Sequence, residues 1–231
     1  MTNNKSQIIN HKSSVKLFLT DVDGCLTDGG MYYSAEGEAL KRFCVYDGMG
    51  MVCLQQAGIP CGILTSEQSQ IVKARAEKLK LQFLYLGVGS KVGKSVTRYD
   101  FSGSSVSPCP SSSITPELNS GIGFAELPSM TKLDAAQEIC TRLGITLDDV
   151  CYVGDDINDI DLLSAVGLPC CPPNARPEVK AISKASGAQA DIHILNTPGG
   201  QGAIREITDL ILSASNTTST LKRDKNDTKT R

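Results

Sequence analysis

Residues 15–24 read VKLFLTDVDG, a short apolar run that changes abruptly into two carboxylates separated by one residue. The run over residues 15–20 predicts a buried β-strand, and Asp21 and Asp23 follow where that strand ends. In a parallel α/β sheet, ligands bind just beyond the carboxyl ends of the strands. The two carboxylates therefore belong to a candidate binding site.

Apolar runs and helical patterns continue to alternate along the chain. The other predicted strands cover residues 31–34, 39–43, 60–64, 83–86, 150–153, 168–171 and 191–195. The predicted helices cover residues 48–57, 67–79, 132–143, 158–166 and 202–212, and one more follows Pro177. Residues 31–34 and 39–43 flank a turn at Gly37 and predict a β-hairpin. The alternation predicts an α/β fold, a Rossmann-like parallel sheet with helices on both faces.

Composition narrows the class of protein. The chain has 231 residues, with 23 Lys and Arg against 25 Asp and Glu. This near-balance argues against a nucleic-acid partner, and no apolar run approaches the ~20 residues that span a bilayer. Residues 1–10 lack the apolar segment of a secretory signal, and the nine cysteines form no C-x-x-C pair. We therefore expect a soluble cytoplasmic protein with free thiols and no membrane partner.

Three polar stretches fall outside the alternating pattern. Residues 1–14 and 213–231 lack a periodic apolar face and are predicted to be disordered tails. Residues 89–131 are rich in Ser, Gly and Pro and hold neither a helical nor a strand period for long. So long a loop is uncommon in a compact domain unless it is functional or an insertion. We predict one domain over residues 15–212 with an insertion at about residues 89–131.

Two further predicted strands end in residues suited to phosphate chemistry. PCGIL is followed by Thr65 and Ser66, whose hydroxyls can donate to phosphate oxygens, and VCYV is followed, after a glycine, by Asp155 and Asp156. Two carboxylates 4 Å apart repel by about 4 kcal/mol at an effective dielectric constant near 20. A hard cation relieves this repulsion, and Mg²⁺ typically takes one or two carboxylates together with phosphate and water. The strand ends together predict a magnesium-dependent phosphate site.

On these motifs the sequence resembles the haloacid dehalogenase-like phosphohydrolases. The resemblance rests on DVDGCLTDGG and extends to YDGMG, GILTSEQSQIVKARAEKLK, KLDAAQEICTRLGITLDDVCYVGDDINDIDLL and GGQGAIREI. It is closest to the branch without a cap domain that hydrolyses phosphorylated 3-deoxy-2-keto sugar acids. That branch includes the 3-deoxy-D-manno-octulosonate (KDO) 8-phosphate phosphatases and the nonulosonate (KDN or sialic acid) 9-phosphate phosphatases. Most of its members lack the stretch at residues 89–131.

The resemblance implies a role for each matched residue. Asp21 is the expected nucleophile, which forms an aspartyl-phosphate intermediate. Asp23 is the expected general acid and base, and Thr65 is expected to hydrogen-bond the transferring phosphoryl group. Mg²⁺ would be held by Asp21, the backbone carbonyl of Asp23 and Asp155, with Asp156 supporting these ligands from behind.

The same family places a lysine after its third strand to stabilise the phosphoryl group. Here the candidates are Lys91 and Lys132. We favour Lys132, because KLDAAQEI resembles the family helix that resumes after the insertion.

The sequence leaves two classes of sugar acid phosphate as candidate substrates. The octulosonate branch commonly shows Thr-Gly-Arg after the second main strand, and the nonulosonate branch resembles Thr-Gly-Glu with a Lys eleven residues later. This chain has Glu67 and Lys78 at the latter positions but Ser66 in place of Gly, while YDGMG and GGQGAIRE look closer to the octulosonate branch. We lean slightly toward the nine-carbon acid, with Glu67 and Lys78 as substrate contacts. The alternative is that Glu67 only complements a helix N-terminus and Lys78 is solvated.

Because members of this branch lack a cap domain, the resemblance implies that the active site is closed by assembly into a homotetramer. The resemblance implies that the hairpin packs between subunits and that residues 199–202 reach a neighbouring active site. Gly200 and Gln201 are the expected contacts, and Arg205 is expected to bind the substrate carboxylate. The alternative for this segment is a plain loop before the last helix.

Two other classes of protein fit less well. A phosphoacceptor signalling domain would carry its accepting Asp after a middle strand, where this chain has Thr65. A catalytically inactive oligomerisation module of a sugar cytidylyltransferase would not need Asp21, Asp23 and Asp155, which are all present. The sequence favours an enzyme.

Overall fold

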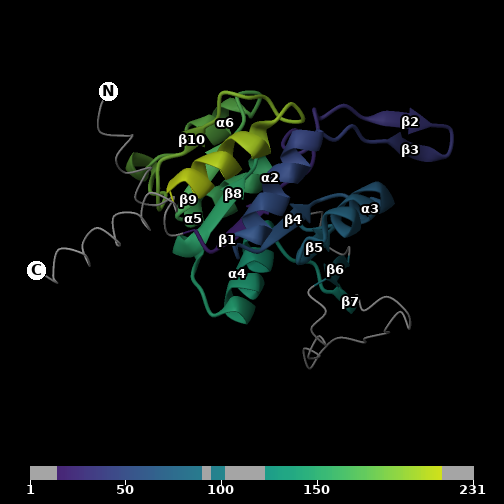
Figure 1. Cartoon of the computed structure of the whole chain (residues 1–231), viewed down its shortest axis with the longest axis horizontal. Coiled ribbons are helices and arrows are strands. Elements are labelled where there is room, and N and C mark those ends of the chain that lie inside the picture. The colour runs from purple at the N-terminus through teal and green to yellow at the C-terminus, as the bar shows by residue number, and fades with distance from the viewer. Residues whose placement is uncertain (1–14, 90–94, 102–122, 215–231) are drawn as a thin grey trace, which may run out of the picture.

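A single large sheet organises the part of the chain that the computed structural model describes, which is residues 15–89, 95–101 and 123–214. The sheet has eight strands in the order β10-β9-β8-β1-β4-β5-β6-β7, and β2 and β3 form a separate hairpin (Figure 1). The sheet strands are β1 (Leu17–Thr20), β4 (Cys61–Thr65), β5 (Phe83–Leu86), β6 (Val96–Asp100), β7 (Gly123–Leu127), β8 (Val150–Val153), β9 (Leu168–Cys171) and β10 (His193–Ile194). The hairpin strands are β2 (Tyr32–Ser34) and β3 (Gly37–Leu40).

The strand β1 lies between β8 and β4 and runs parallel to both. All four of its residues are buried, because a parallel sheet covered on both faces has no polar side. Every neighbouring pair from β10 to β5 is parallel. The predicted parallel α/β sheet is confirmed, and the carboxyl ends of β1, β4 and β8 lie side by side.

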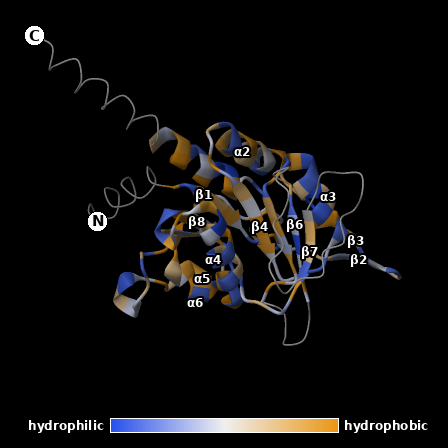
Figure 2. Cartoon of the chain, turned by 90° about the horizontal axis from the view of Figure 1, so that it is seen from below, coloured by the Kyte–Doolittle hydropathy of each residue, from blue (hydrophilic) through white to orange (hydrophobic). Residues whose placement is uncertain are grey.

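Helices cover both faces of this sheet. They are α2 (Val45–Gln56), α3 (Gln70–Leu79), α4 (Lys132–Leu143), α5 (Ile160–Ala165), α6 (Pro177–Lys180) and a last helix over residues 203–214. Leu54 of α2 and Ile207 of the last helix belong to one apolar cluster, whereas Ile139 of α4 and Leu162 of α5 belong to another. Figure 2 shows α2 on one side of the sheet and α4, α5 and α6 on the other. In the described ranges no helix combines the length and apolarity needed to cross a bilayer.

The predicted insertion contains regular structure that its sequence did not indicate. Strands β6 and β7 extend the sheet, antiparallel to β5 and to each other. All of β6 is buried, including Arg98 and Asp100, which pair with Glu138 and Arg142 of α4. These charges interrupt the apolar pattern of VTRYD, and a helix distant in the sequence neutralises them. Residues 90–94 and 102–122 lie outside the described residues, as do residues 1–14 and 215–231 of the predicted tails.

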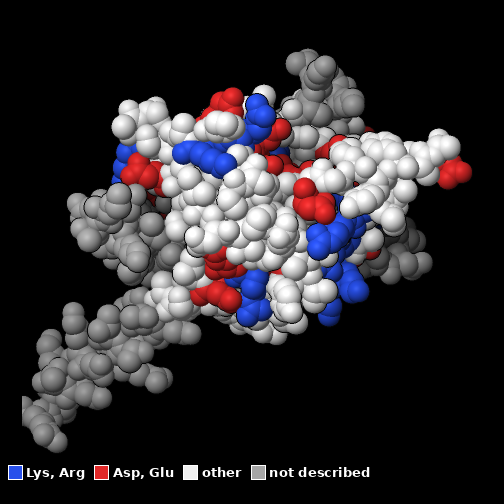
Figure 3. Space-filling model, turned by 90° about the horizontal axis from the view of Figure 1, so that it is seen from above, with Lys and Arg blue, Asp and Glu red and all other residues white. Residues whose placement is uncertain are grey.

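The β2-β3 hairpin projects from the body of the molecule (Figure 1). Its second strand spans Gly37–Leu40 instead of the predicted residues 39–43, and Gly37 adopts a φ of 123° that side chains rarely tolerate. Tyr33 and Leu40 expose 63% and 65% of their surface. Figure 3 shows the projecting hairpin as mainly uncharged, with an acidic side chain near its tip. The hairpin therefore presents apolar side chains that nothing else in the described chain covers.

Candidate active site

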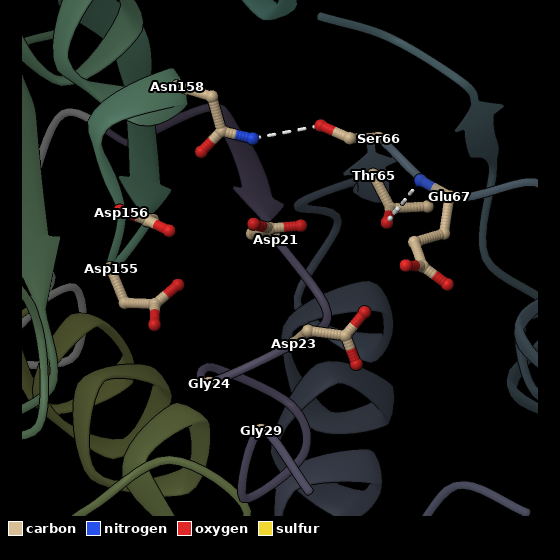
Figure 4. A pocket seen from close by; sticks show the side chains of 10 residues that line it. All are labelled: Asp21, Asp23, Gly24, Gly29, Thr65, Ser66, Glu67, Asp155, Asp156 and Asn158. Carbon is tan, nitrogen blue, oxygen red and sulfur yellow. Dashed lines mark hydrogen bonds between the residues drawn. The ribbon is translucent and has the colours of Figure 1, made fainter. Parts of the chain in front are cut away.

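A pocket opens at the carboxyl ends of β1, β4 and β8. Its lining residues come from the loops that follow these strands: Asp21, Asp23, Gly24, Gly29, Thr65, Ser66, Glu67, Asp155, Asp156 and Asn158. In Figure 4, Asp21 lies between the side chains that follow β8 and those that follow β4. The structure thus brings together most of the site residues that the sequence predicted.

Asp21 lies at the base of this pocket and is 7% exposed. Its Oδ1 accepts a 2.7 Å bond from the backbone N–H of Val22, and its Oδ2 accepts a 2.8 Å bond from Lys132 Nζ. Burial raises the pKa of Asp21 to about 6, although the positive charge of Lys132 opposes this shift. The remaining lone pairs of the carboxylate are free to face a ligand.

Lys132 is the first residue of α4, and its side chain is 1% exposed. The helix begins there because Thr131 and Asp134 form a capping box, in which Thr131 Oγ1 accepts the Asp134 N–H at 3.1 Å. Burial disfavours the charged lysine, but Asp21 and Asp159 outweigh it and raise the pKa of Lys132. Lys132 therefore stays an ammonium group beside Asp21, as the sequence predicted, while Lys91 lies outside the described residues.

Asp159 is a site residue that the sequence prediction missed. It is fully buried, and its Oδ1 lies 2.6 Å from Lys132 Nζ and accepts the hydroxyl of Tyr152. Its Oδ2 accepts the backbone N–H groups of Asp155 and Asp156 at 3.0 and 3.1 Å. Asp159 thus holds the loop after β8 and the buried lysine together, the support that we had assigned to Asp156. The sequence feature that marks Asp159 is its position as the third aspartate of GDDIND, which falls inside the helix predicted over residues 158–166.

Three carboxylates of this pocket converge closely enough to share a cation. Oxygen atoms of Asp21, Asp155 and Asp159 all lie within 4.8 Å of one another. Burial, together with the charges of Asp21 and Asp159, raises the pKa of Asp155 to about 7. Gly24 permits this approach, because a Cβ there would lie 2.0 Å from Asp155 Oδ2. An all-oxygen set of this kind fits a hard divalent ion.

Asp156 lines the same pocket, but its carboxylate is hydrogen-bonded to the backbone of the next residue. Its Oδ1 accepts the backbone N–H of Ile157 at 2.7 Å and caps the short 3-10 turn Ile157–Asp159. Asp156 is therefore not the residue that supports Asp155 and Lys132 in this structure. That position belongs to Asp159.

Asp23 faces the pocket from the loop after β1. Lys41, a second residue that the sequence prediction missed, donates to both of its oxygens at 2.8 and 2.9 Å. Thr27 Oγ1 donates to Oδ1 of Asp23 at 3.2 Å. Nothing in the LKRF stretch distinguished Lys41 from an exposed lysine, because its partners lie on other segments.

The residues after β4 form the opposite wall of the pocket. Thr65 is 2% exposed, and its Oγ1 accepts the backbone N–H of Glu67 at 3.3 Å. Ser66 Oγ accepts a 2.8 Å bond from Asn158 Nδ2, which joins this loop to the loop after β8 (Figure 4). Ser66, the departure from the family pattern, therefore ties two walls of the site together.

The segment at residues 199–202 packs closely against its own chain. The N–H of Gly200 donates to the carbonyl of Cys25 at 3.0 Å, and a Cβ on Gly199 would lie 1.8 Å from the Gly24 carbonyl oxygen. The two glycines are needed for this close packing against the chain's own loop after Asp23. Gly200 therefore packs within its own chain, and Gln201 is exposed and does not line this chain's pocket, while entry of the segment into a neighbouring subunit's site stays a prediction.

Two predicted substrate contacts also lie away from the pocket. Arg205 is engaged on its own helix, where its Nε lies 2.8 Å from Asp209 Oδ1. Lys78 lines a separate pocket near the C-terminal ends of α2 and α3, with Val52 and Gln55 among its neighbours. Within this single chain, Glu67 lines the site and Lys78 does not.

Comparisons with known proteins agree with this geometry. A family model described as haloacid dehalogenase-like hydrolase matches residues 122–192. A structure from Legionella pneumophila assigned to that superfamily, subfamily III A, is 30% identical, with a TM-score of 0.68, and the match covers 94% of this chain and 96% of that one.

Named phosphatases are found among the relatives as well. The 3-deoxy-D-manno-octulosonate 8-phosphate phosphatase of Haemophilus influenzae is 29% identical over 201 residues, 87% of this chain and 84% of that protein. The enzyme of that name from Moraxella catarrhalis, solved with magnesium, phosphate and KDO, has a TM-score of 0.68 at 28% identity and covers 95% of this chain and 98% of that one. The chain belongs to the haloacid dehalogenase-like hydrolases and is a phosphatase of that family.

Proposed function

We propose that the chain is a Mg²⁺-dependent phosphatase that removes the terminal phosphate of a 3-deoxy-2-keto sugar acid. The observation that carries the proposal is the pairing of Asp21 with Lys132 at the base of a pocket walled by further carboxylates. A carboxylate held beside a buried ammonium is suited to attack a phosphate monoester, because the lysine attracts the anionic phosphoryl group. The similarity to sugar-acid phosphatases supports the substrate class.

The proposed reaction has two steps. An Asp21 oxygen attacks phosphorus, the bond from phosphorus to the sugar oxygen breaks, and Asp23 gives its proton to that oxygen. Water then attacks the aspartyl-phosphate and gives a proton to Asp23, which regenerates Asp21 and releases phosphate. Lys132 and the hydroxyl of Thr65 stabilise the equatorial oxygens during both steps.

The metal would be held by Asp21, Asp155 and the backbone carbonyl of Asp23. Asp21 and Asp155 are two of the three carboxylates whose oxygens lie within 4.8 Å of one another. Mg²⁺ supplies positive charge that offsets the repulsion between these carboxylates and the incoming phosphate. Asp159 is already occupied by Lys132, Tyr152 and two backbone N–H groups, so we assign it the role of holding the ligands in place.

The eight-carbon acid is the better supported substrate. The named relatives are octulosonate 8-phosphate phosphatases, and the pair of residues that favoured a nine-carbon acid is divided between two pockets. Glu67 alone lines the site, so a preference for a nonulosonate 9-phosphate rests on that one residue.

We propose in addition that the chain assembles through its hairpin, as a homotetramer. The support is the set of exposed apolar side chains on the hairpin and the first half of α2: Met31, Tyr32, Tyr33, Leu40, Val45, Tyr46 and Met49. Large apolar side chains exposed together on neighbouring segments of the chain are typical of protein interfaces. Light scattering tests this directly, and a monomer at full activity contradicts it.

A substrate panel tests the proposed function. Phosphate release is measured from octulosonate 8-phosphate, a nonulosonate 9-phosphate and hexose 6-phosphates, with Mg²⁺ and with a chelator. We expect Mg²⁺-dependent release that is fastest with octulosonate 8-phosphate and vanishes in Asp21→Asn. Equal rates on hexose phosphates would refute the sugar-acid assignment, and activity that persists in Asp21→Asn would refute the mechanism.

A further inference from the structure

A second buried lysine lies beside Asp23, and none of the strand-end motifs includes it. Lys41 directly follows β3 of the hairpin, and its side chain is 2% exposed. Its Nζ lies 2.8 and 2.9 Å from the two oxygens of Asp23 and 2.8 Å from Glu38 Oε1. Glu67 Oε2 lies 3.8 Å away, so three carboxylates surround one ammonium group.

These contacts fix the orientation of the Asp23 carboxyl group. A lysine buried to this degree is retained only when its charge is paired and hydrogen-bonded, and here Asp23 and Glu38 provide the partners. Glu38 is held in turn by the hydroxyl of Ser69 at the N-terminus of α3. Lys41 therefore links Asp23 to the hairpin and to α3.

The hydrogen bonds distinguish the two oxygens of Asp23. Oδ1 accepts from Lys41 and lies 3.2 Å from Thr27 Oγ1, whose single hydrogen is shared with the Val22 carbonyl 3.3 Å away, whereas among the described residues Oδ2 accepts from Lys41 alone. Each carboxylate oxygen has two acceptor positions, so the second position of Oδ1 faces the Thr27 hydroxyl and the second position of Oδ2 is left for a ligand. Asp23 lines the pocket, so Oδ2 is the oxygen of Asp23 that is available to a substrate.

We propose that Lys41 is a positioning residue that holds Oδ2 of Asp23 toward the leaving oxygen of the substrate. The inference rests on the proposed function. In the first step the proton on Oδ2 passes to the sugar oxygen as its bond to phosphorus breaks and the bond from Asp21 to phosphorus forms. In the second step a proton from the attacking water returns to Oδ2. Lys41 touches none of the reacting atoms and acts through Asp23.

Leaving groups that need no proton provide the test. Single-turnover rates are measured for Lys41→Met with octulosonate 8-phosphate, whose alkoxide must be protonated, and with 2,4-dinitrophenyl phosphate, whose phenolate leaves unprotonated. We expect the transfer rate to fall about 100-fold for the sugar phosphate, while the burst of dinitrophenolate stays within about threefold of the wild type. Lys41→Arg, which can still donate to both oxygens of Asp23, is expected to recover at least about tenfold of the lost rate.

Controls separate this role from support of the fold. Lys16→Met removes an exposed lysine that pairs with Asp149 away from the site, and it is expected to leave both rates unchanged. Should Lys41→Met fail to fold, Lys41→Met/Glu38→Leu removes both hairpin charges together and must show the same selective loss. Equal losses on both substrates, or no loss on either, would overturn the proposal. A wild type that releases dinitrophenolate but no phosphate from any sugar acid would instead overturn the proposed substrate class, and Lys41 would then be tested on another alkyl phosphate.

Discussion

Two buried lysines hold the two aspartates of the DVDG motif, and they are anchored in different parts of the molecule. Lys132 pairs with Asp21 and Asp159, and Lys41 pairs with Asp23 and Glu38, at distances between 2.6 and 2.9 Å. Their side chains are 1% and 2% exposed. In both, the carboxylate partners outweigh the effect of burial and raise the pKa of the lysine.

The difference lies in what supports each pair. Lys132 begins a capped helix on the core, and its second partner, Asp159, is fully buried. Lys41 stands at the base of a hairpin whose strands are largely exposed, and the side chain of Glu38 is 18% exposed. The proposed nucleophile is thus fixed by the core, whereas the proposed acid and base is fixed by a projecting element. A contact that moved the hairpin would therefore act on Asp23 and leave Asp21 in place.

The largest expected effect comes from removing the core lysine. Lys132→Met leaves Asp21 and Asp159 as unpaired buried carboxylates, so the free energy of unfolding should fall by about 3–5 kcal/mol. We expect kcat to fall by about 10³-fold because the phosphoryl group loses its cation. Urea unfolding and steady-state kinetics measure the two effects. Lys41→Met, whose partners are less buried, should lose clearly less stability, and an equal loss would contradict the difference in anchorage.

The second carboxylate partners of the two lysines are Asp159 and Glu38, and Asp159 should contribute more to the free energy of unfolding. Asp159→Asn removes the charge that faces Lys132 and weakens the bonds to two backbone N–H groups, so we expect a loss of about 2–3 kcal/mol in unfolding free energy. Glu38→Gln keeps an acceptor for Lys41 on a partly exposed side chain and should cost about 1 kcal/mol or less. Thermal unfolding of both variants checks this ranking. A larger loss for Glu38→Gln would show that the hairpin contributes more to stability than the core pair.

The sequence predicted the core lysine's surroundings far better than the hairpin's. Asp21 directly follows β1, Thr65 is the last residue of β4, and Asp155 follows β8 after one glycine. Because the carboxyl ends of parallel strands meet at one edge, local pattern was sufficient for these three residues. Lys41 and Asp159 carry no such signal, since their roles depend on partners brought together by the fold. Arg98 and Asp100 hid a strand for the same reason: their charges are paired only in the folded chain.

The packing of the glycines at residues 199–202 shows the limit of composition as a guide. Three glycines within four residues indicated a segment flexible enough to reach a neighbouring subunit, as the family resemblance implied. The structure instead uses the missing side chains to bring backbone within contact of backbone, which no sequence pattern distinguishes from flexibility.

The next effect is the dependence of stability on pH that Asp21 and Asp155 should produce. Without metal, the pKa values of Asp21 and Asp155 are raised to about 6 and about 7, so between about pH 4 and 7 the folded chain binds more protons than the unfolded chain. Stability should therefore decrease as the pH rises through this window, by about 1.4 kcal/mol for each unit by which a carboxyl pKa is raised. Added Mg²⁺ should raise the unfolding temperature at pH 7 and have little effect at pH 5. A metal-free protein that becomes more stable from pH 5 to pH 7 would contradict the assignment.

The smallest expected effect tests whether the two lysine clusters communicate within one chain. The hydroxyl of Ser66 accepts a hydrogen bond from Asn158, the residue before Asp159. Ser66 is also the residue before Glu67, which lies near Lys41. Ser66→Gly removes this side-chain bridge, and an exposed hydrogen bond contributes about 0.5–1 kcal/mol. We expect kcat to change less than about threefold and the effects of Ser66→Gly and Lys41→Met to add within about 0.5 kcal/mol, as for independent sites. A double-mutant cycle with a larger coupling energy would mean that the hairpin acts on the core cluster through this bridge, so that a displacement of the hairpin would reach Asp21 as well as Asp23.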